Sequence, residues 1–308
     1  MRREHSGLKQ FFVAFSIGIM VLSIPFSYAI FRFAGSKILA SSQPENYYPQ
    51  SSDAITLTVA LRETGKDKPH SILLCKVDPL ETAVKIAVIP PETMVEDAGR
   101  FDSVANVWRR EGAKRAADAL ENALEVSSDR WLDLSSDSIS KLGDVVGAID
   151  FTLDQSLQLE SGLSALPQGR QLIDGRRATI LMNYTGYPGG EASRLKTIED
   201  LTEQMLIQRL PLMTDSLLLK AFETAVNTGN SDLTVGDFES RRRALAHMLS
   251  RSLKVEVVAV QGEYNAGKNT FLPSAQTLSA LSDAFNTQKR SSNSRIAFSS
   301  TMALPVKE

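Results

Sequence analysis

A run of 21 residues, Phe11 to Phe31, contains no charged side chain. An α-helix of that length spans roughly 30 Å, which matches the hydrocarbon core of a bilayer. A helix buried in a soluble core would carry a polar face, and this run has none. We therefore predict that residues 11–31 form a single transmembrane helix, with the lipid bilayer as a partner.

Basic residues stand on both sides of this run: Arg2, Arg3 and Lys9 precede it, and Arg32 and Lys37 follow it. The bias is small, but it favours a cytoplasmic N-terminus. Residues 1–10 are then a cytoplasmic stub, and the main domain is extracytoplasmic, held at the cell membrane. An alternative is a cleaved signal peptide, because Ser27-Tyr28-Ala29 has the small-x-small form of a signal-peptidase site. Both interpretations export the rest of the chain.

The composition excludes several classes of protein. The formal net charge is −2, which argues against a strongly basic nucleic-acid binder, so we expect no nucleic-acid partner. A single cysteine, Cys75, excludes an internal disulfide and a zinc site built from cysteines. The three histidines are too scattered along the chain to suggest a histidine metal cluster.

The rest of the chain divides into a linker, one domain and a tail. Residues 41–53 are rich in Ser and contain two prolines, so we assign 32–53 to a linker. Residues 288–308 show little periodicity and are predicted to be a flexible tail. The domain between them, residues 54–287, alternates apolar runs with amphipathic segments.

Strands are expected at 54–61, 71–77, 83–89, 131–134, 148–153, 178–183 and 253–260. Helices are expected at 113–124, 138–146, 193–210, 214–226, 236–252 and 274–285. Strands interleaved with helices predict an α/β fold, a layered sandwich with a central mixed β-sheet flanked by helices.

Several motifs follow one another in a recognisable order: Ser71-Ile-Leu-Leu-Cys-Lys-Val-Asp-Pro79, Ile89-Pro-Pro-Glu-Thr93, Val146-Gly-Ala-Ile-Asp150 and Gly169-Arg-Gln-Leu-Ile-Asp-Gly-Arg-Arg-Ala178. In this order and spacing the chain resembles the LytR-CpsA-Psr family of bacterial envelope proteins, over about residues 55–285. No single motif is decisive, and the resemblance depends on the whole series.

The resemblance implies a function in cell-envelope biogenesis. Members of that family transfer glycopolymers from a polyprenyl-pyrophosphate lipid to peptidoglycan, so both of these are implied as partners. Arginines hold the pyrophosphate, carboxylates bind Mg²⁺, and a hydrophobic cleft holds the lipid. Guanidinium groups suit this chemistry because their paired donors match phosphate oxygens.

Most of the family's charged residues are replaced in this chain. Lys68 stands where the family has Arg, His70 where it has a metal-binding Asp, Pro91 and Glu92 where it has Arg-Asp, and Asn183 and Thr185 where it has arginines. Arg194 is retained, with Glu191 in place of an Asp. Because each lost contact to a phosphoryl transition state removes a few kcal/mol of stabilisation, we expect transferase activity to be weakened or lost.

The resemblance assigns candidate site residues on this basis. Arg194 is the candidate catalytic residue. Lys68, Arg176, Arg177 and Arg194 are the candidate phosphate-binding residues, to which Lys196 can add a charge. Glu191 is the candidate ligand of Mg²⁺, the one cofactor that the resemblance suggests.

Three functional hypotheses remain open. A glycopolymer-binding protein or transferase predicts a deep apolar cleft between sheet and helices, with Arg194 and Lys68 at its mouth. A non-catalytic binding, scaffold or regulatory protein of envelope assembly predicts a shallow or filled cleft. An unrelated exported sensor or adhesion domain would lack the central sheet.

Two further motifs have simple structural interpretations. Gly262 to Lys268 has the glycine and lysine spacing of a phosphate loop, but Asn269 replaces the required Ser or Thr, so a turn is the better interpretation. Arg241-Arg242-Arg243 and Arg251 form either a solvated helix face or a surface for anionic lipid or polymer.

Overall fold

The computed structural model describes residues 47–158, 164–265 and 267–286. The predicted transmembrane segment 11–31, the stub before it and the tail 288–308 lie outside these residues. Within the described part of the chain, no helix combines the length and the apolar character needed to cross a bilayer. The account below concerns the unit that begins at Tyr47.

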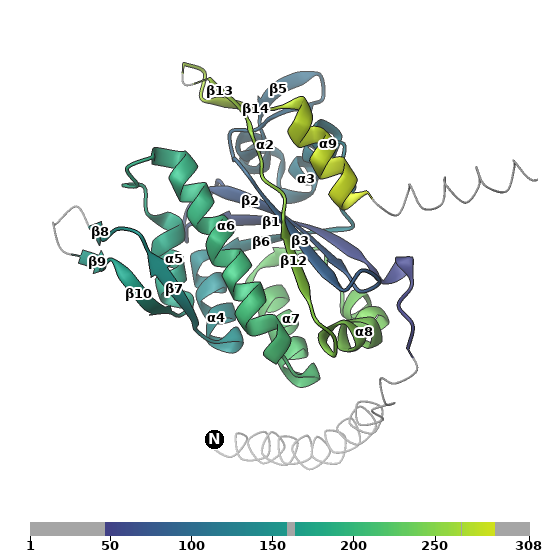
Figure 1. Ribbon diagram of the computed structural model, residues 1–308. Coiled ribbons are helices and arrows are strands. Elements are labelled where there is room, and N and C mark those ends of the chain that lie inside the picture. Colours follow the sequence, from purple (N-terminus) through teal and green to yellow (C-terminus); the bar gives the residue numbers. More distant parts are fainter. Residues whose placement is uncertain (1–46, 159–163, 266, 287–308) are drawn as a thin grey trace, which may run out of the picture. The chain divides into compact units, whose positions relative to one another are not determined.

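A six-stranded mixed sheet forms the centre of the domain, in the order β11-β6-β1-β2-β3-β12 (Figure 1). Its strands are β1 (Ile55–Arg62), β2 (Ser71–Asp78), β3 (Ala83–Ile89), β6 (Arg130–Ser135), β11 (Asn230–Ser231) and β12 (Lys254–Val257). β2 is antiparallel to both of its neighbours, β1 and β3, whereas β6 runs parallel to β1 and β12 parallel to β3. The predicted central mixed sheet is therefore confirmed.

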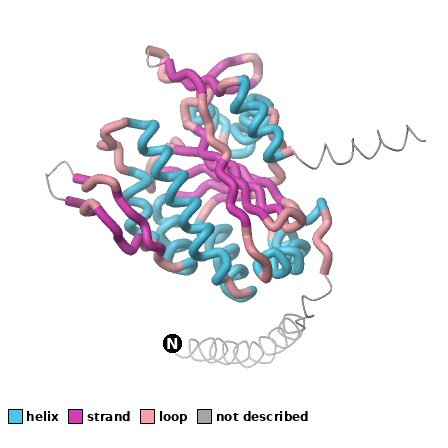
Figure 2. Tube along the Cα trace, viewed as in Figure 1, coloured by secondary structure: helices cyan, strands magenta, loops and turns pink. Residues whose placement is uncertain are grey.

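Helices cover both faces of this sheet (Figures 1 and 2). One layer contains α2 (Val104–Glu111), α3 (Ala113–Leu124) and α9 (Ala275–Phe285). The other contains α4 (Ser136–Val146), α5 (Gly175–Asn183), α6 (Gly190–Arg209), α7 (Asp215–Thr228) and α8 (Val235–Leu249). Along β2, Ile72 and Leu74 pack into the first layer, and Leu73 packs into the second. A strand buried on both faces has a nearly continuous apolar sequence, which is the pattern of β2 and β3.

Local signals explain the sharpest boundaries. The Asp78 carboxylate accepts hydrogen bonds from the N–H groups of Leu80 and Glu81, at 3.1 and 3.2 Å, and so closes the β2–β3 turn. The Ser274 hydroxyl caps α9 by accepting from the Thr277 N–H, at 3.2 Å. These boundaries agree with the predicted strands at 71–77 and 83–89 and with the predicted helix at 274–285.

Four two-stranded sheets surround the core: β4 (Met94–Asp97) with β5 (Arg100–Ser103), β7 (Ile149–Leu153) with β10 (Gly169–Ile173), β8 (Leu157–Gln158) with β9 (Ser164–Leu166), and β13 (Gly262–Asn265) with β14 (Thr270–Pro273). The Phe271 N–H donates to the Glu92 carbonyl at 2.9 Å, which fixes the β13–β14 hairpin beside the segment that follows β3. Residues 262–265 and 267–268 therefore belong to a hairpin. The segment directly after Lys268 and Asn269 is strand β14, whereas a phosphate loop leads straight into a helix.

The expected strand at 178–183 is wrong, because these residues belong to helix α5. Asp174 caps the helix by accepting from the Arg177 N–H at 2.8 Å, and Leu181 and Met182 are buried in the core. A short apolar run has no periodicity that separates a buried strand from a buried helix, so the capping residue was the better signal. A smaller difference is that α4 begins at Ser136, with Ser135 as its cap, two residues before the predicted start at 138.

The α4–α5 contact depends on two glycines and generates a prediction. A Cβ atom on Gly143 would overlap the backbone of Gly175, so Gly143→Ala should force the helices apart. We expect Gly143→Ala to lower the free energy of unfolding by about 2 kcal/mol, measured by urea denaturation. Gly236→Ala is the matched control, because a Cβ there meets only the Thr234 hydroxyl at 3.5 Å. Equal stability of the two variants would contradict this account of the contact.

Candidate functional site

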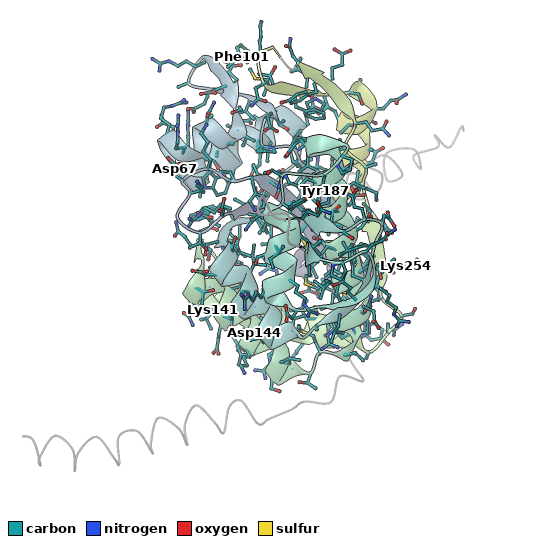
Figure 3. All side chains as sticks on the ribbon, turned by 90° about the vertical axis from the view of Figure 1, so that its left-hand side faces the viewer. Asp67, Phe101, Lys141, Asp144, Tyr187 and Lys254 are labelled. Atoms are coloured by element: carbon teal, nitrogen blue, oxygen red, sulfur yellow. The ribbon has the colours of Figure 1, made fainter. Side chains whose placement is uncertain are left out.

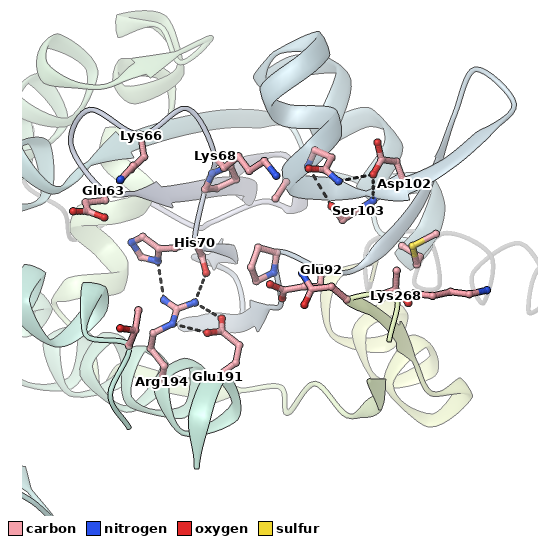
Figure 4. Close-up of a pocket in the computed structure, with 18 of the residues that line it drawn as sticks. Glu63, Lys66, Lys68, His70, Glu92, Asp102, Ser103, Glu191, Arg194 and Lys268 are labelled. Atoms are coloured by element: carbon pink, nitrogen blue, oxygen red, sulfur yellow. Dashed lines mark hydrogen bonds and ion pairs between the residues drawn. The ribbon is translucent and has the colours of Figure 1, made fainter. Parts of the chain in front are cut away.

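A pocket of about 700 Å³ opens where β1 ends (Figure 4). Its walls come from the β1–β2 loop, the segment after β3, the β4–β5 hairpin with the start of α2, the α5–α6 region and the β13–β14 hairpin. Segments far apart in the sequence thus converge on one site. Lys68, Glu191 and Arg194, three of the predicted site residues, all line it.

Arg194 forms the back of this pocket and is only 4% exposed. Its Nε donates to Glu191 Oε2 at 2.8 Å. One Nη donates to His70 Nδ1 at 2.9 Å and to the Met182 carbonyl at 3.0 Å. The other Nη donates to the His70 carbonyl and to Glu191 Oε1. A guanidinium has five N–H groups, and all five are used by these acceptors. In this arrangement Arg194 holds these protein segments together and has no donor left for a phosphate oxygen.

His70 is held as a neutral imidazole. Burial lowers its pKa from 6.5 to about 4, and the nearby charge of Arg194 acts in the same direction. Because the guanidinium can only donate, Nδ1 accepts and the proton lies on Nε2. Nε2 is buried and has no partner among the described residues. His70 therefore offers no carboxylate, and no vacant lone pair, at the position where the resemblance implies a metal-binding Asp.

Two carboxylates lie in the pocket close enough to influence each other. Burial raises the pKa of Glu92, and the charge of Glu191 raises it further. Glu92 Oε2 is buried without a hydrogen-bond partner in the described chain, whereas both oxygens of Glu191 accept from Arg194. The described residues contain no group of three or more Asp, Glu, His or Cys that could hold a metal. The donor set thus fits Mg²⁺ only if substrate oxygens complete its coordination, which is common for this ion.

Exposed lysines surround the opening. Lys66 and Lys68 lie in the β1–β2 loop and Lys268 lies in the β13–β14 hairpin, and all three line the pocket. Lys66 and Lys268 were not predicted as site residues. The sequence singled out Lys268 through the phosphate-loop spacing of residues 262–268, but only the fold shows that the hairpin containing Lys268 packs beside Glu92.

The predicted residues Arg176 and Arg177 do not line this pocket. Both are exposed in the first turn of α5, where one Nη of Arg177 donates to the Leu172 carbonyl at 2.6 Å. Lys196 is also separate, because its ammonium pairs with Glu199 and Asp200 at 2.7 and 2.6 Å.

The interior between the sheet and α4–α6 is filled with side chains. Leu73, Val88, Leu181, Ile198 and Leu201 meet there, and none is more than 9% exposed. The pocket also has an exposed apolar side chain at its rim, Phe101 of β5, which is 72% exposed and projects from the domain (Figure 3). The deep apolar cleft expected of a lipid-binding transferase is thus occupied by the protein's own core at this position.

Comparison with known proteins supports the resemblance that the series of motifs indicated. Residues 52–287 match the model of the LytR_cpsA_psr family. A stretch of 118 residues is 25% identical to the polyisoprenyl-teichoic acid–peptidoglycan teichoic acid transferase TagU of Halalkalibacterium halodurans. That stretch covers 36% of this chain and 39% of TagU, so the match spans well under two thirds of the relative's length.

Solved structures share the fold over most of their length. B. subtilis TagV aligns with a TM-score of 0.62 at 18% identity, covering 76% of this chain and 96% of that chain. A transcriptional regulator from Enterococcus faecalis aligns with a TM-score of 0.63 at 14% identity, covering 83% of this chain and 98% of that chain. At these identities the likeness shows the fold alone.

The neutral state of His70 predicts a loss of stability in acid. Between pH 6.5 and about 4 the unfolded chain binds a proton at His70 that the folded chain does not, so stability falls as the pH falls through this window. The full loss is about 3 kcal/mol. We expect His70→Asn, which keeps an acceptor for Arg194, to lose less stability than the wild type between pH 7 and pH 4.5 in urea denaturation. Equal losses in the two proteins would show that His70 is not the group responsible.

Proposed function

Because the chain belongs to the LytR-CpsA-Psr family, we propose that it is an envelope protein that binds a polyprenyl-pyrophosphate-linked glycan at the Arg194 pocket, with weakened transferase activity. The uncharged run at 11–31 supports a membrane anchor, and the flanking charges support an extracytoplasmic domain. The TagU relative is by name a transferase between polyisoprenyl-linked teichoic acid and peptidoglycan, which supports this class of substrate.

The observation that carries the proposal is the saturation of Arg194. In the transfer reaction, a peptidoglycan hydroxyl attacks the phosphorus next to the glycan, and polyprenyl phosphate leaves. Negative charge on the phosphoryl oxygens must be met by cations already held in position. Arg194 is held in position, but its five N–H groups are already used by protein acceptors. The principal residue that the resemblance assigns to catalysis is therefore committed to the fold.

The lysines at the rim take over the recognition of phosphate in this proposal. Lys66, Lys68 and Lys268 provide three positive charges around one opening. An ammonium on a flexible stem binds phosphate as a point charge and lacks the paired donors of a guanidinium. Glu92, with substrate oxygens, would hold Mg²⁺, which adds positive charge beside the pyrophosphate. Such a site binds the ligand better than it stabilises a transition state.

The second candidate function is a non-catalytic scaffold or regulator of envelope assembly on the same fold. The filled interior favours it, because buried core residues such as Leu181 and Ile198 occupy the place of a lipid cleft. The two candidates differ in whether the pocket binds a polyprenyl pyrophosphate at all.

Binding of a short polyprenyl pyrophosphate to the full chain in nonionic detergent tests the proposal. We expect Lys68→Ala to weaken binding about tenfold, or about 1.4 kcal/mol, because it removes a cation from the rim. Lys220→Ala is the matched control, since it removes an exposed charge from α7, outside the pocket. Titrations with and without Mg²⁺ measure the contribution of the ion.

Two results would contradict the proposal. If the wild-type chain does not bind the lipid, the pocket is not a pyrophosphate site and the scaffold function is favoured. If the purified chain transfers glycan to peptidoglycan as fast as TagU in the same assay, catalysis is not weakened and Arg194 must exchange its protein acceptors for substrate.

A further inference from the structure

A second pocket, of about 260 Å³, lies at the opposite end of β1 from the Arg194 pocket. Thr56 at the start of β1 lines the second pocket, and Glu63, just after its end, lines the first. Seven residues of extended strand separate them, which is roughly 23 Å. The second pocket is therefore a separate site, which the proposed transfer chemistry does not use.

Lys76 contributes a buried cation to its wall. The residue is 1% exposed, and its ammonium lies 3.6 Å from Asp78 Oδ2. An ammonium taken out of water is costly unless negative or polar groups surround it. Burial accordingly lowers the pKa of Lys76, in spite of the attraction of Asp78.

Arg241 on α8 contributes a second cation with an unused donor. One of its Nη atoms donates to the Asp237 carbonyl at 3.1 Å, and its Nε is buried without a hydrogen-bond partner among the described residues. Buried N–H groups are nearly always paired in native structures, so an unpaired guanidinium donor beside a cavity indicates a missing acceptor.

The rest of the wall is polar. Asp129 is its one carboxylate, and Asp129 Oδ2 already accepts from the Thr56 N–H at 2.7 Å. Ser52 and Ser127 line the pocket with hydroxyl groups, and Asn286 lines it with an amide. The Asn286 amide nitrogen already donates to the Glu125 carbonyl and to the Ser282 hydroxyl. The lining thus carries two cations and one carboxylate, together with hydroxyl groups that can donate hydrogen bonds.

We propose that this second pocket binds a small oxyanion, a phosphate or a phosphate ester, between the ammonium of Lys76 and the guanidinium of Arg241. A phosphate has oxygens enough to accept from the Arg241 Nε–H, the Lys76 ammonium and a hydroxyl at the same time. The volume accommodates one phosphate group with a small substituent. Free phosphate and a phospholipid headgroup share this chemistry.

The headgroup has support from the course of the chain. Ser52 and Ala54 line the pocket, close to Tyr47, where the described residues begin. Tyr47 follows the predicted membrane segment 11–31 within a short stretch of sequence. The pocket is therefore close in sequence to the segment that would join the domain to a membrane helix.

Hydrogen–deuterium exchange of the full chain in nonionic detergent tests the site locally. The probes are inorganic phosphate and dihexanoyl phosphatidylglycerol below its micelle concentration, each compared with chloride at equal ionic strength. We expect ligand-dependent protection of residues 52–57 and 280–286. Arg241→Met and Lys76→Met should each weaken the affinity for the probe, measured from this protection, at least tenfold. Arg241→Met leaves Asp237 paired with Arg130, at 2.9 and 3.0 Å, so the fold should tolerate it.

Arg243→Gln is the matched control, because it removes an exposed charge from the same helix outside the pocket. Lys68→Ala separates this site from the Arg194 pocket and should leave the protection unchanged. Tighter binding of the lipid than of phosphate would identify a headgroup site, and the reverse would identify a site for free phosphate. The proposal is overturned if neither probe protects these residues, or if Arg241→Met and Arg243→Gln respond alike.

Discussion

The guanidinium of Arg194 holds together the three segments that form the back of the main pocket. It joins Glu191 at the start of α6, the Met182 carbonyl at the end of α5, and His70 just before β2. A buried cation is tolerated when acceptors use all of its donors, and here they do. The position of α6 against the sheet therefore depends on the same side chain that the family resemblance assigns to phosphate binding.

Because the donors of Arg194 are all used by the protein, the positive charge available to a ligand lies at the rim of the pocket and not at its back. Lys66, Lys68 and Lys268 are exposed and flexible, whereas Arg194 is buried and fixed. Stabilising a transition state requires donors held in place before the reaction, because their reorganisation would otherwise raise the barrier. Binding a pyrophosphate in its ground state requires less, since mobile ammonium groups can adjust to it. The arrangement consequently favours recognition over catalysis.

The sequence predicts the parts of this fold that local signals determine. The two apolar runs around Asp78 specify the β2–β3 hairpin, and Ser274 marks the start of α9. It fails at 178–183, where a buried helix and a buried strand have the same apolar composition. It also cannot show that Arg194 is saturated, because the acceptor His70 lies 124 residues away and approaches only through the tertiary fold.

The hydrogen bonds of Arg194, which is buried, and of Arg241, which is half-buried, give the two arginines different roles in this domain. Arg194 matches a family motif, yet every one of its donors is used by the protein, so it acts as structure. Arg241 matches no motif of the family, yet one of its buried donors has no acceptor in the described chain. An unpaired buried donor costs about 1–3 kcal/mol, and a ligand oxygen removes that cost on binding. The capacity to bind an anion is therefore better inferred from unused donors than from a residue's match to a family motif.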